Sequence, residues 1–304
     1  MRQVLFEIPG LHLRIFGFGV MLCLAFFGAV SLAAWKAKRS KLDPEIVYDL
    51  ALWILIGGLF GARALYVWEY WGTRIQSLSE VFQIWEGGIV LYGGVMGASI
   101  AGLIYWMRRP FPLLPVMDAV APAIALGLAL GRVGCFLNGC CYGDECALPW
   151  AVSFPPGSPP WWHQVVDPEG RLTHHLPGVT QQVANAVREG KIPAATAWSK
   201  PVHPTQIYSV IDGLILLGLL LAFYPLRRRD GQVMALLLVT YPVTRFLIER
   251  LRGDEPAFFA GLTISQNVSL GLLAAGVAFW AVLQARPARL YAEMQVEPVA
   301  EAVV

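Results

Sequence analysis

The chain has 304 residues, of which 56% are hydrophobic and only 14% are charged. Soluble proteins carry about 25% charged residues, so this composition argues against a freely soluble protein and indicates an integral membrane protein. The formal net charge of +2 is too small, and the basic residues are too scattered, for a surface that binds nucleic acid.

Seven apolar runs are each long enough to cross a membrane, which takes about 20 helical residues. In chain order we expect these helices at residues 15–35, 47–68, 89–107, 116–136, 205–225, 233–251 and 260–283. The first run is too long for a signal peptide, and its positive charge follows the apolar residues, so we interpret it as a retained helix. Basic clusters follow the first, third, fifth and seventh runs. Cytoplasmic loops are rich in Lys and Arg, which predicts an N-terminus outside and a C-terminus inside.

These runs predict an all-α membrane protein of seven transmembrane helices. The long polar segment at about residues 137–204 would form a small extracytoplasmic arm between helices 4 and 5, with a short amphipathic stretch near residues 179–191. We expect one membrane domain over residues 1–289 and a short cytoplasmic tail over residues 290–304.

Polar side chains gather toward the outer leaflet, although they come from different helices. In the predicted topology this group is Arg63, Tyr92, Arg132, His203, Arg245 and Glu249. Ionisable residues inside a membrane are costly and usually mark function. Since several arginines share this depth with one carboxylate, the group predicts an anionic ligand such as a lipid phosphate. The alternative is that the arginines only reach the lipid headgroups and bind nothing specific.

Four cysteines lie within twelve residues of the predicted outer face, namely Cys135, Cys140, Cys141 and Cys146. An oxidising compartment makes one or two disulfides the first expectation. A metal site is less favoured, because the spacing lacks a C-x-x-C pair and no histidine is close in sequence. A redox or acceptor role for one thiol is the remaining interpretation.

Four ordered motifs resemble those of the prolipoprotein diacylglyceryl transferase family. They are WEGGIVLYGG at residues 85–94, GRVGCFLNG at residues 131–139 with Gly143 beyond it, HPTQIY at residues 203–208 and YPVTRFLIE at residues 241–249. The resemblance covers about residues 14–283. It implies a bacterial inner-membrane enzyme that moves the diacylglyceryl group of phosphatidylglycerol to the lipobox cysteine thiol of a preprolipoprotein and releases glycerol phosphate. It also implies that no metal or soluble cofactor is required.

The resemblance also implies roles for single residues. Arg132 would hold the lipid phosphate, and Arg245 with Glu249 would organise the headgroup and the leaving group. The other substrate-binding residues that we expect are Arg63, Asn138, Gly143, His203 and Tyr208.

Three positions depart from the family's pattern. Tyr92 replaces a histidine proposed as the base, Cys135 replaces an asparagine, and Phe16 replaces a tyrosine. We expect Tyr92 in the catalytic set with Arg245 and Glu249, although a free tyrosine titrates near pH 10 and is a poor base at neutral pH.

Three alternatives follow from the same residues. A divergent homologue could use the same lipid with another acceptor, as the change at Tyr92 would allow. A membrane thiol–disulfide redox protein could use Cys140 and Cys141, but it would leave the buried arginines unexplained. An anion transporter fits less well, because the charges share one depth instead of marking a path across the bilayer.

Overall fold

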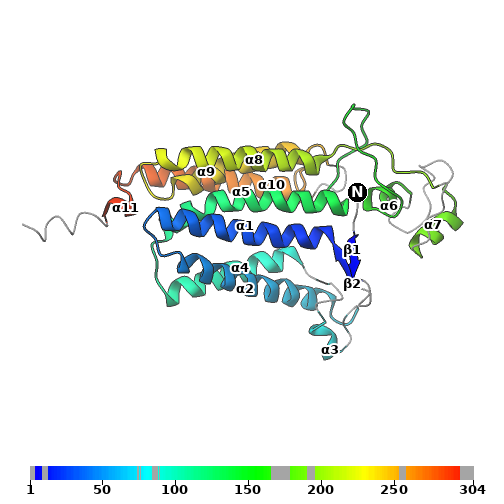
Figure 1. The fold of residues 1–304 in the computed structure, drawn as a ribbon, viewed down its shortest axis with the longest axis horizontal. Helices are drawn as coiled ribbons and strands as arrows, with labels where there is room; N and C mark the ends of the chain where they lie inside the picture. The colour runs from blue at the N-terminus through cyan, green and yellow to red at the C-terminus, as the bar shows by residue number, and fades with distance from the viewer. Residues whose placement is uncertain are drawn as a thin grey trace, which may run out of the picture. The chain divides into compact units, whose positions relative to one another are not determined.

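The computed structural model describes residues 4–8, 13–73, 75, 77–83, 88, 90–165, 179–189, 196–252 and 258–294. The chain divides into two compact units, whose helices and strands are labelled in Figure 1. The first unit comprises Met1–Ala29 and Ala121–Ala288, and the second comprises Val30–Val120 and Arg289–Val304.

Six described helices are long and apolar enough to cross a membrane. They are α1 (Gly17–Arg39), α2 (Glu45–Tyr70), α5 (Leu113–Asn138), α8 (Thr205–Phe223, continued by the 3-10 turn η2, Tyr224–Leu226), α9 (Gln232–Glu249) and α10 (Ile264–Gln284). They confirm a multi-pass, mainly helical protein and six of the seven expected spans. The expected span at residues 89–107 forms α4 (Leu91–Arg108), which is not among these six. Its glycines, its serine and its terminal arginine lower its hydropathy.

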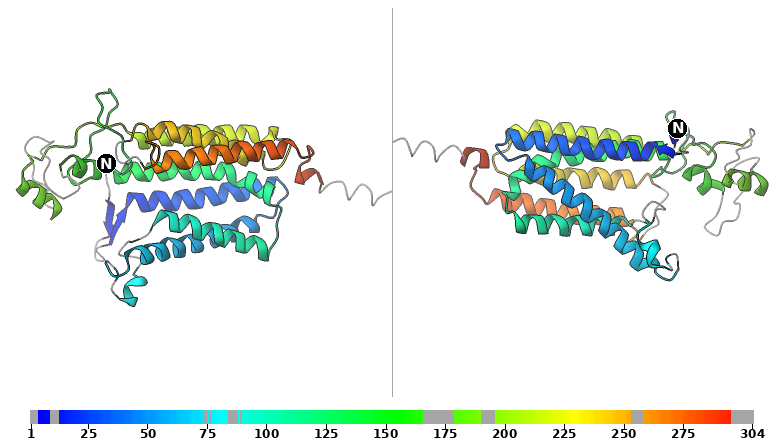
Figure 2. Two further views of the ribbon diagram at one scale, coloured as in Figure 1. Left: turned by 180° about the vertical axis from the view of Figure 1, so that it is seen from behind. Right: turned by 60° about the horizontal axis from the view of Figure 1, so that its bottom comes forward.

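The first unit is built on helices that run side by side (Figure 2). Contacts join α9 to both α8 and α10. Small residues set the spacing, because an added Cβ at Gly213 of α8 would lie 3.0 Å from Ala129 of α5, and one at Gly276 of α10 would lie 2.7 Å from the carbonyl oxygen of Leu238 on α9. Close backbone approach through small residues is typical of membrane helices.

A β-hairpin precedes α1 and departs from the expected all-α fold. Strands β1 (Val4–Ile8) and β2 (Leu13–Phe16) pair antiparallel, with Val4 opposite Phe16 and Ile8 opposite Leu13. A short pair of strands gives a weak periodic signal, and an adjoining apolar helix masks it further.

The arm between α5 and α8 has a small core of its own. Helix α6 (Pro159–Val165) places Trp161 and Val165 against Val179 and against Val187 of α7 (Gln181–Arg188). Helix α7 confirms the expected amphipathic stretch over its described residues. The threonine that precedes it caps its first turn through a side-chain hydrogen bond.

The second unit is organised by α2 and α4, which pack on glycines. An added Cβ at Gly61 of α2 would overlap the carbonyl oxygen of Gly93 on α4, and one at Gly97 of α4 would overlap the carbonyl oxygen of Gly57 on α2. The two backbones therefore touch directly, as in other small-residue helix pairs. The short helices α3 (Leu78–Val81) and α11 (Tyr291–Met294) complete this unit.

Candidate active site

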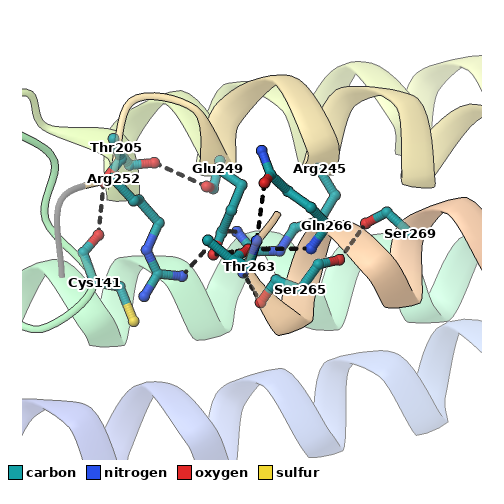
Figure 3. A network of polar contacts seen from close by, with 10 residues as sticks. Cys141, Thr205, Arg245, Glu249, Arg252, Thr263, Ser265, Gln266 and Ser269 are labelled. Atoms are coloured by element: carbon teal, nitrogen blue, oxygen red, sulfur yellow. Dashed lines mark hydrogen bonds and ion pairs between the residues drawn. The ribbon is translucent and has the colours of Figure 1, made fainter. Parts of the chain in front are cut away.

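The carboxylate of Glu249 lies between two arginines at the end of α9 (Figure 3). Its side chain has 0% exposure, and its Oε2 lies 2.6 Å from Nη1 of Arg245 and 3.4 Å from Nη1 of Arg252. Helical geometry explains the grouping, because residues four and seven apart share one face. Arg252 was missed by the sequence reasoning, and its spacing of seven from Arg245 was the signal that could have found it.

The start of α10 completes this polar network. Thr263 caps the helix in a capping box with Gln266, and its Oγ1 donates to Oε1 of Glu249 at 3.4 Å. Ser265 in the same turn accepts a hydrogen bond from Nη2 of Arg245 at 3.2 Å. The two amino groups of the Arg245 guanidinium are therefore held by residues of different helices, Nη1 by Glu249 of α9 and Nη2 by Ser265 of α10. The guanidinium is thus oriented before any ligand binds.

Arg132 and Arg245 line one small pocket in the first unit. Its wall includes Leu128, Arg132, Ser209, Asp212, Gly213, Tyr241, Arg245 and Ile248. The structure thus brings together two arginines that lie more than one hundred residues apart in sequence. Oδ2 of Asp212 accepts from Thr244 at 3.0 Å. An arginine pair of this kind provides planar donors suited to a phosphate.

Arg132 also lines a second, apolar groove of about 410 Å³. Phe18 and Leu22 of α1 form one side of the groove, and Leu128, Arg132 and Cys135 of α5 form the other. Most of the side chains that line the groove are apolar, which suits a hydrocarbon chain, and Arg132 and Cys135 add a cation and a thiol to its wall.

The loop after α5 turns back over the end of the helix. Gly139 has a φ of +80°, a left-handed conformation that suits glycine. The amides of Gly139 and Cys140 both donate to the carbonyl oxygen of Cys135, at 2.8 and 3.2 Å. This left-handed helix end places the residue after the glycine over the last turn of the helix. Cys140 therefore lies beside the last turn of α5, close to Cys135.

Helix α8 holds this loop in place. Oγ1 of Thr205 donates to the carbonyl oxygen of Cys141 at 2.6 Å, and Nε2 of Gln206 donates to that of Cys140 at 2.8 Å. Both side chains are buried, at 2% and 0% exposure. The HPTQIY motif thus uses its threonine and glutamine to brace the cysteine loop.

The cysteines are free thiols, so the expectation of disulfides was wrong for this structure. The Sγ atoms of Cys135, Cys140 and Cys141 all lie within 4.8 Å of one another, whereas Cys146 is not part of this group. The return of the loop over the helix end brings them together without a C-x-x-C pair. Hydrogen bonds from the Cys135 and Cys140 thiols, aided by the charges of Arg132 and Arg252, hold the pKa of Cys141 well below its usual range.

The other expected residues of the first unit have clear structural surroundings. An added Cβ at Gly143 would overlap the carbonyl oxygen of Leu251, so the close packing there requires glycine. Nδ1 of His203 lies 3.4 Å from the hydroxyl of Tyr208, which also accepts from Trp150 at 2.8 Å. Asn138 is the last residue of α5. Their substrate-binding roles stay predictions.

Arg63 and Tyr92 belong to the second unit. Arg63 is 8% exposed and donates to the carbonyl oxygens of Glu80, Val81 and Gly88. It also lines an apolar cavity of about 760 Å³ with residues that include Phe60 and Phe82. Tyr92 lies in the first turn of α4 and is 53% exposed. Trp85, Glu86, Gly87 and Ile89 of the motif before it lie outside the described residues.

Comparison with known proteins agrees with these motifs. The family model described as prolipoprotein diacylglyceryl transferase matches residues 3–282. The chain is 30% identical to the phosphatidylglycerol–prolipoprotein diacylglyceryl transferase of Clostridium tetani over 91% of this chain and 96% of that protein. The proteins of the same name from Rhodopirellula baltica and a Nostoc species are 31% and 30% identical, over 86% and 93% of this chain and 70% and 90% of theirs. The chain therefore belongs to the prolipoprotein diacylglyceryl transferase family.

Proposed function

We propose that the protein transfers the sn-1,2-diacylglyceryl group of phosphatidylglycerol to the thiol of a lipobox cysteine in a prolipoprotein. The observation that carries this proposal is the position of Arg132, which lines both the small polar pocket with Arg245 and the apolar groove beside α1. A phospholipid needs this combination, because its phosphate is anionic and its acyl chains are apolar.

In the reaction, the acceptor thiol loses its proton to solvent, and its sulfur attacks the glyceryl carbon that carries the phosphate ester. The C–S bond forms, the C–O bond breaks, and glycerol phosphate departs with its negative charge. Arg132 and Arg245 stabilise the charge that grows on the leaving group, since fixed cations in a site of low dielectric constant stabilise such a transition state. Glu249 keeps Arg245 in place for this role.

The same proposal includes a membrane orientation. We place the protein in the bacterial inner membrane with α4 as a seventh span, the N-terminus outside and the C-terminus inside. This orientation puts the basic residues at the end of α1, which are Lys36, Lys38 and Arg39, on the cytoplasmic side with the three arginines after α8.

A transfer assay tests the proposed function. Purified protein is incubated with phosphatidylglycerol and a lipobox peptide, and the peptide is analysed by mass spectrometry. We expect a mass increase of one diacylglyceryl group on the cysteine peptide and none on a matched serine peptide. Arg132→Ala should abolish transfer while membrane insertion continues, because the lipid phosphate loses its cation.

Two results would oppose the proposal. Full transfer by Arg132→Ala would remove the role assigned to that arginine. Binding of phosphatidylglycerol without transfer to any lipobox peptide would favour a relative that uses the same lipid with another acceptor, as the tyrosine at position 92 allows.

A further inference from the structure

Three thiols meet at the end of α5 at distances close to those of a metal site. The Sγ atoms of Cys135, Cys140 and Cys141 lie within 4.8 Å of one another. Zinc–sulfur bonds are about 2.3 Å long, so three sulfurs around one zinc ion lie about 4 Å apart. Small side-chain rotations would therefore close the group around one ion.

The backbone of this loop is held in the conformation that gathers the thiols. Cys141 has a φ of +60°, a left-handed conformation that is costly for a residue other than glycine. The hydrogen bonds from Thr205 and Gln206 to the carbonyl oxygens of Cys141 and Cys140 hold it there. A cost of this kind persists where the surrounding structure imposes it, and such residues cluster at functional sites.

The surrounding charges suit a divalent ion bound by three thiolates. Such a complex carries one net negative charge, and Arg132, which lines the same groove as Cys135, supplies a positive charge beside it.

We infer that Cys135, Cys140 and Cys141 bind one Zn²⁺ ion, and that the fourth coordination position receives the thiol of the acceptor cysteine. The second part rests on the proposed function. Thiolates select zinc over harder cations, and three protein ligands with one open position are typical of catalytic zinc. The resemblance to the family implied no metal, and the three-thiol geometry is the reason for this different conclusion.

This arrangement supplies the thiolate that the reaction needs. On binding zinc, the acceptor thiol releases its proton to solvent, because a thiol that coordinates zinc is deprotonated outright. The zinc-bound sulfur then attacks the glyceryl carbon, the C–O bond breaks, and glycerol phosphate leaves. The thioether product binds zinc weakly, and water replaces it. Cys135 lines the same groove as Arg132, so donor and acceptor would meet there.

Cobalt titration of the full-length protein tests the metal site directly. The protein is purified in detergent with a reductant and without metal, and Co²⁺ is added as a spectroscopic probe. We expect one Co²⁺ per chain, with the intense absorption of thiolate–cobalt bonds, and loss of that signal when Zn²⁺ displaces the probe. Cys135→Ser, Cys140→Ser and Cys141→Ser should each lose stoichiometric binding. Cys146→Ser is the matched control from the same loop, and it should bind as the unaltered protein does.

A second measurement needs no variant. Maleimide labelling followed by intact-mass spectrometry counts reactive thiols among the five cysteines. Added Zn²⁺ should protect three of them, and a chelator should restore their labelling. Addition of a lipobox peptide to the cobalt-loaded protein should strengthen the thiolate absorption, whereas the serine peptide should not.

These readouts separate the metal site from the transferase function. Metal binding with no lipid transfer would support the site and reject the proposed function. The site is overturned if the reduced protein binds no Co²⁺, if Cys146→Ser loses binding as Cys140→Ser does, or if Zn²⁺ protects no thiol. The role of the fourth position is overturned if the cysteine peptide leaves the cobalt spectrum unchanged, or if the triple serine variant transfers lipid at the full rate.

Discussion

The side chain of Glu249 determines the charge of the polar pocket. A buried carboxylate is costly unless it is paired, and Arg245 and Arg252 both contact this one. Arg132, Arg245 and Arg252 carry three positive charges, and the carboxylates of Glu249 and Asp212 carry two negative charges, so one positive charge remains in excess. This excess matches the single negative charge of a phosphodiester.

Replacing Arg245 by lysine tests the value of its planar guanidinium. Lysine keeps a positive charge for Glu249 but cannot reach Glu249 and Ser265 at the same time. A hydrogen bond from a charged group contributes about 1.5–3 kcal/mol, so loss of one such bond from Arg245 to the departing phosphate should lower transfer by Arg245→Lys by roughly ten- to a hundredfold. The rate is measured by the peptide assay, and loss of the Ser265 hydrogen bond should also lower the thermal midpoint in detergent.

Arg250→Lys is the matched control for this change. Arg250 is exposed and lies over the ring of Phe246, with its charge 6.0 Å from the ring centre. It should retain the activity of the unaltered protein. Equal losses in the two variants would mean that arginine content near the end of α9, and not the geometry of Arg245, sets the rate.

Gly143 tests whether a motif residue is required for packing. An added Cβ would overlap the Leu251 carbonyl oxygen and lie 2.6 Å from Cβ of His203. Overpacking of this kind costs about 1–3 kcal/mol, so Gly143→Ala should lower the thermal midpoint. Gly271→Ala on α10 is the control, because nothing lies within 4 Å of its added Cβ and alanine favours the helix. An unchanged midpoint in Gly143→Ala would show that the loop moves aside easily.

The sequence predicted which single residues are functional candidates better than it predicted the residues that they contact. Arg132, Arg245 and Glu249 were identifiable because a charge inside an apolar run is conspicuous. Arg252 was missed because it follows the apolar run, where an arginine is unremarkable. Arg63 was expected to face a lipid phosphate, yet its donors reach backbone carbonyl oxygens of residues 80, 81 and 88, which no sequence pattern specifies.

At the scale of helices and loops, the conformation at a helix end decides which residues become neighbours, and the spacing of residues in the sequence does not show this. The C-x4-C-C spacing of Cys135, Cys140 and Cys141 does not suggest a metal site when it is read as a linear pattern. The left-handed turn at Gly139 brings the loop back over the end of α5, so the adjacent thiols of Cys140 and Cys141 lie beside that of Cys135. A glycine three residues beyond the predicted end of the helix at residue 136 was the available signal for this reversal.

The α2–α4 pair offers a prediction about helix packing. An added Cβ at Gly97 would overlap the carbonyl oxygen of Gly57 and lie 2.8 Å from Cα of Gly61. Gly97→Ala should therefore push the helices apart, at a cost of about 1–3 kcal/mol, and lower the thermal midpoint. On the same helix, an added Cβ at Gly102 makes ordinary contacts of 3.8 Å with Leu50 and Ile54. Gly102→Ala should be neutral or slightly stabilising, and the reverse order of the two midpoints would contradict this packing.

For the whole molecule, hydropathy predicted most of the helices but left the number of crossings open. Among the described residues, six helices are apolar enough to span the membrane by composition alone, and α4 is not among them because its glycines, its polar and aromatic residues and its terminal arginine lower its mean hydropathy. If α4 did not cross, the basic residues that follow α1 and α8 would face opposite sides of the membrane. With α4 as a span, they face the same side, as the distribution of Lys and Arg in membrane proteins favours.

Reporter fusions decide between these two topologies. Alkaline phosphatase, which is active only outside the cytoplasm, and a fluorescent protein that matures inside it are fused after residues 110, 200 and 228. With seven spans we expect fluorescence at 110, phosphatase activity at 200 and fluorescence at 228, because α4, α5 and α8 each reverse the side. If α4 did not cross, all three signals would be inverted, whereas a fusion after residue 42 would be fluorescent in both cases and serves as the control. The inverted pattern would also place the arm and the loop with the three cysteines on the cytoplasmic side, where an exported lipoprotein does not present its cysteine.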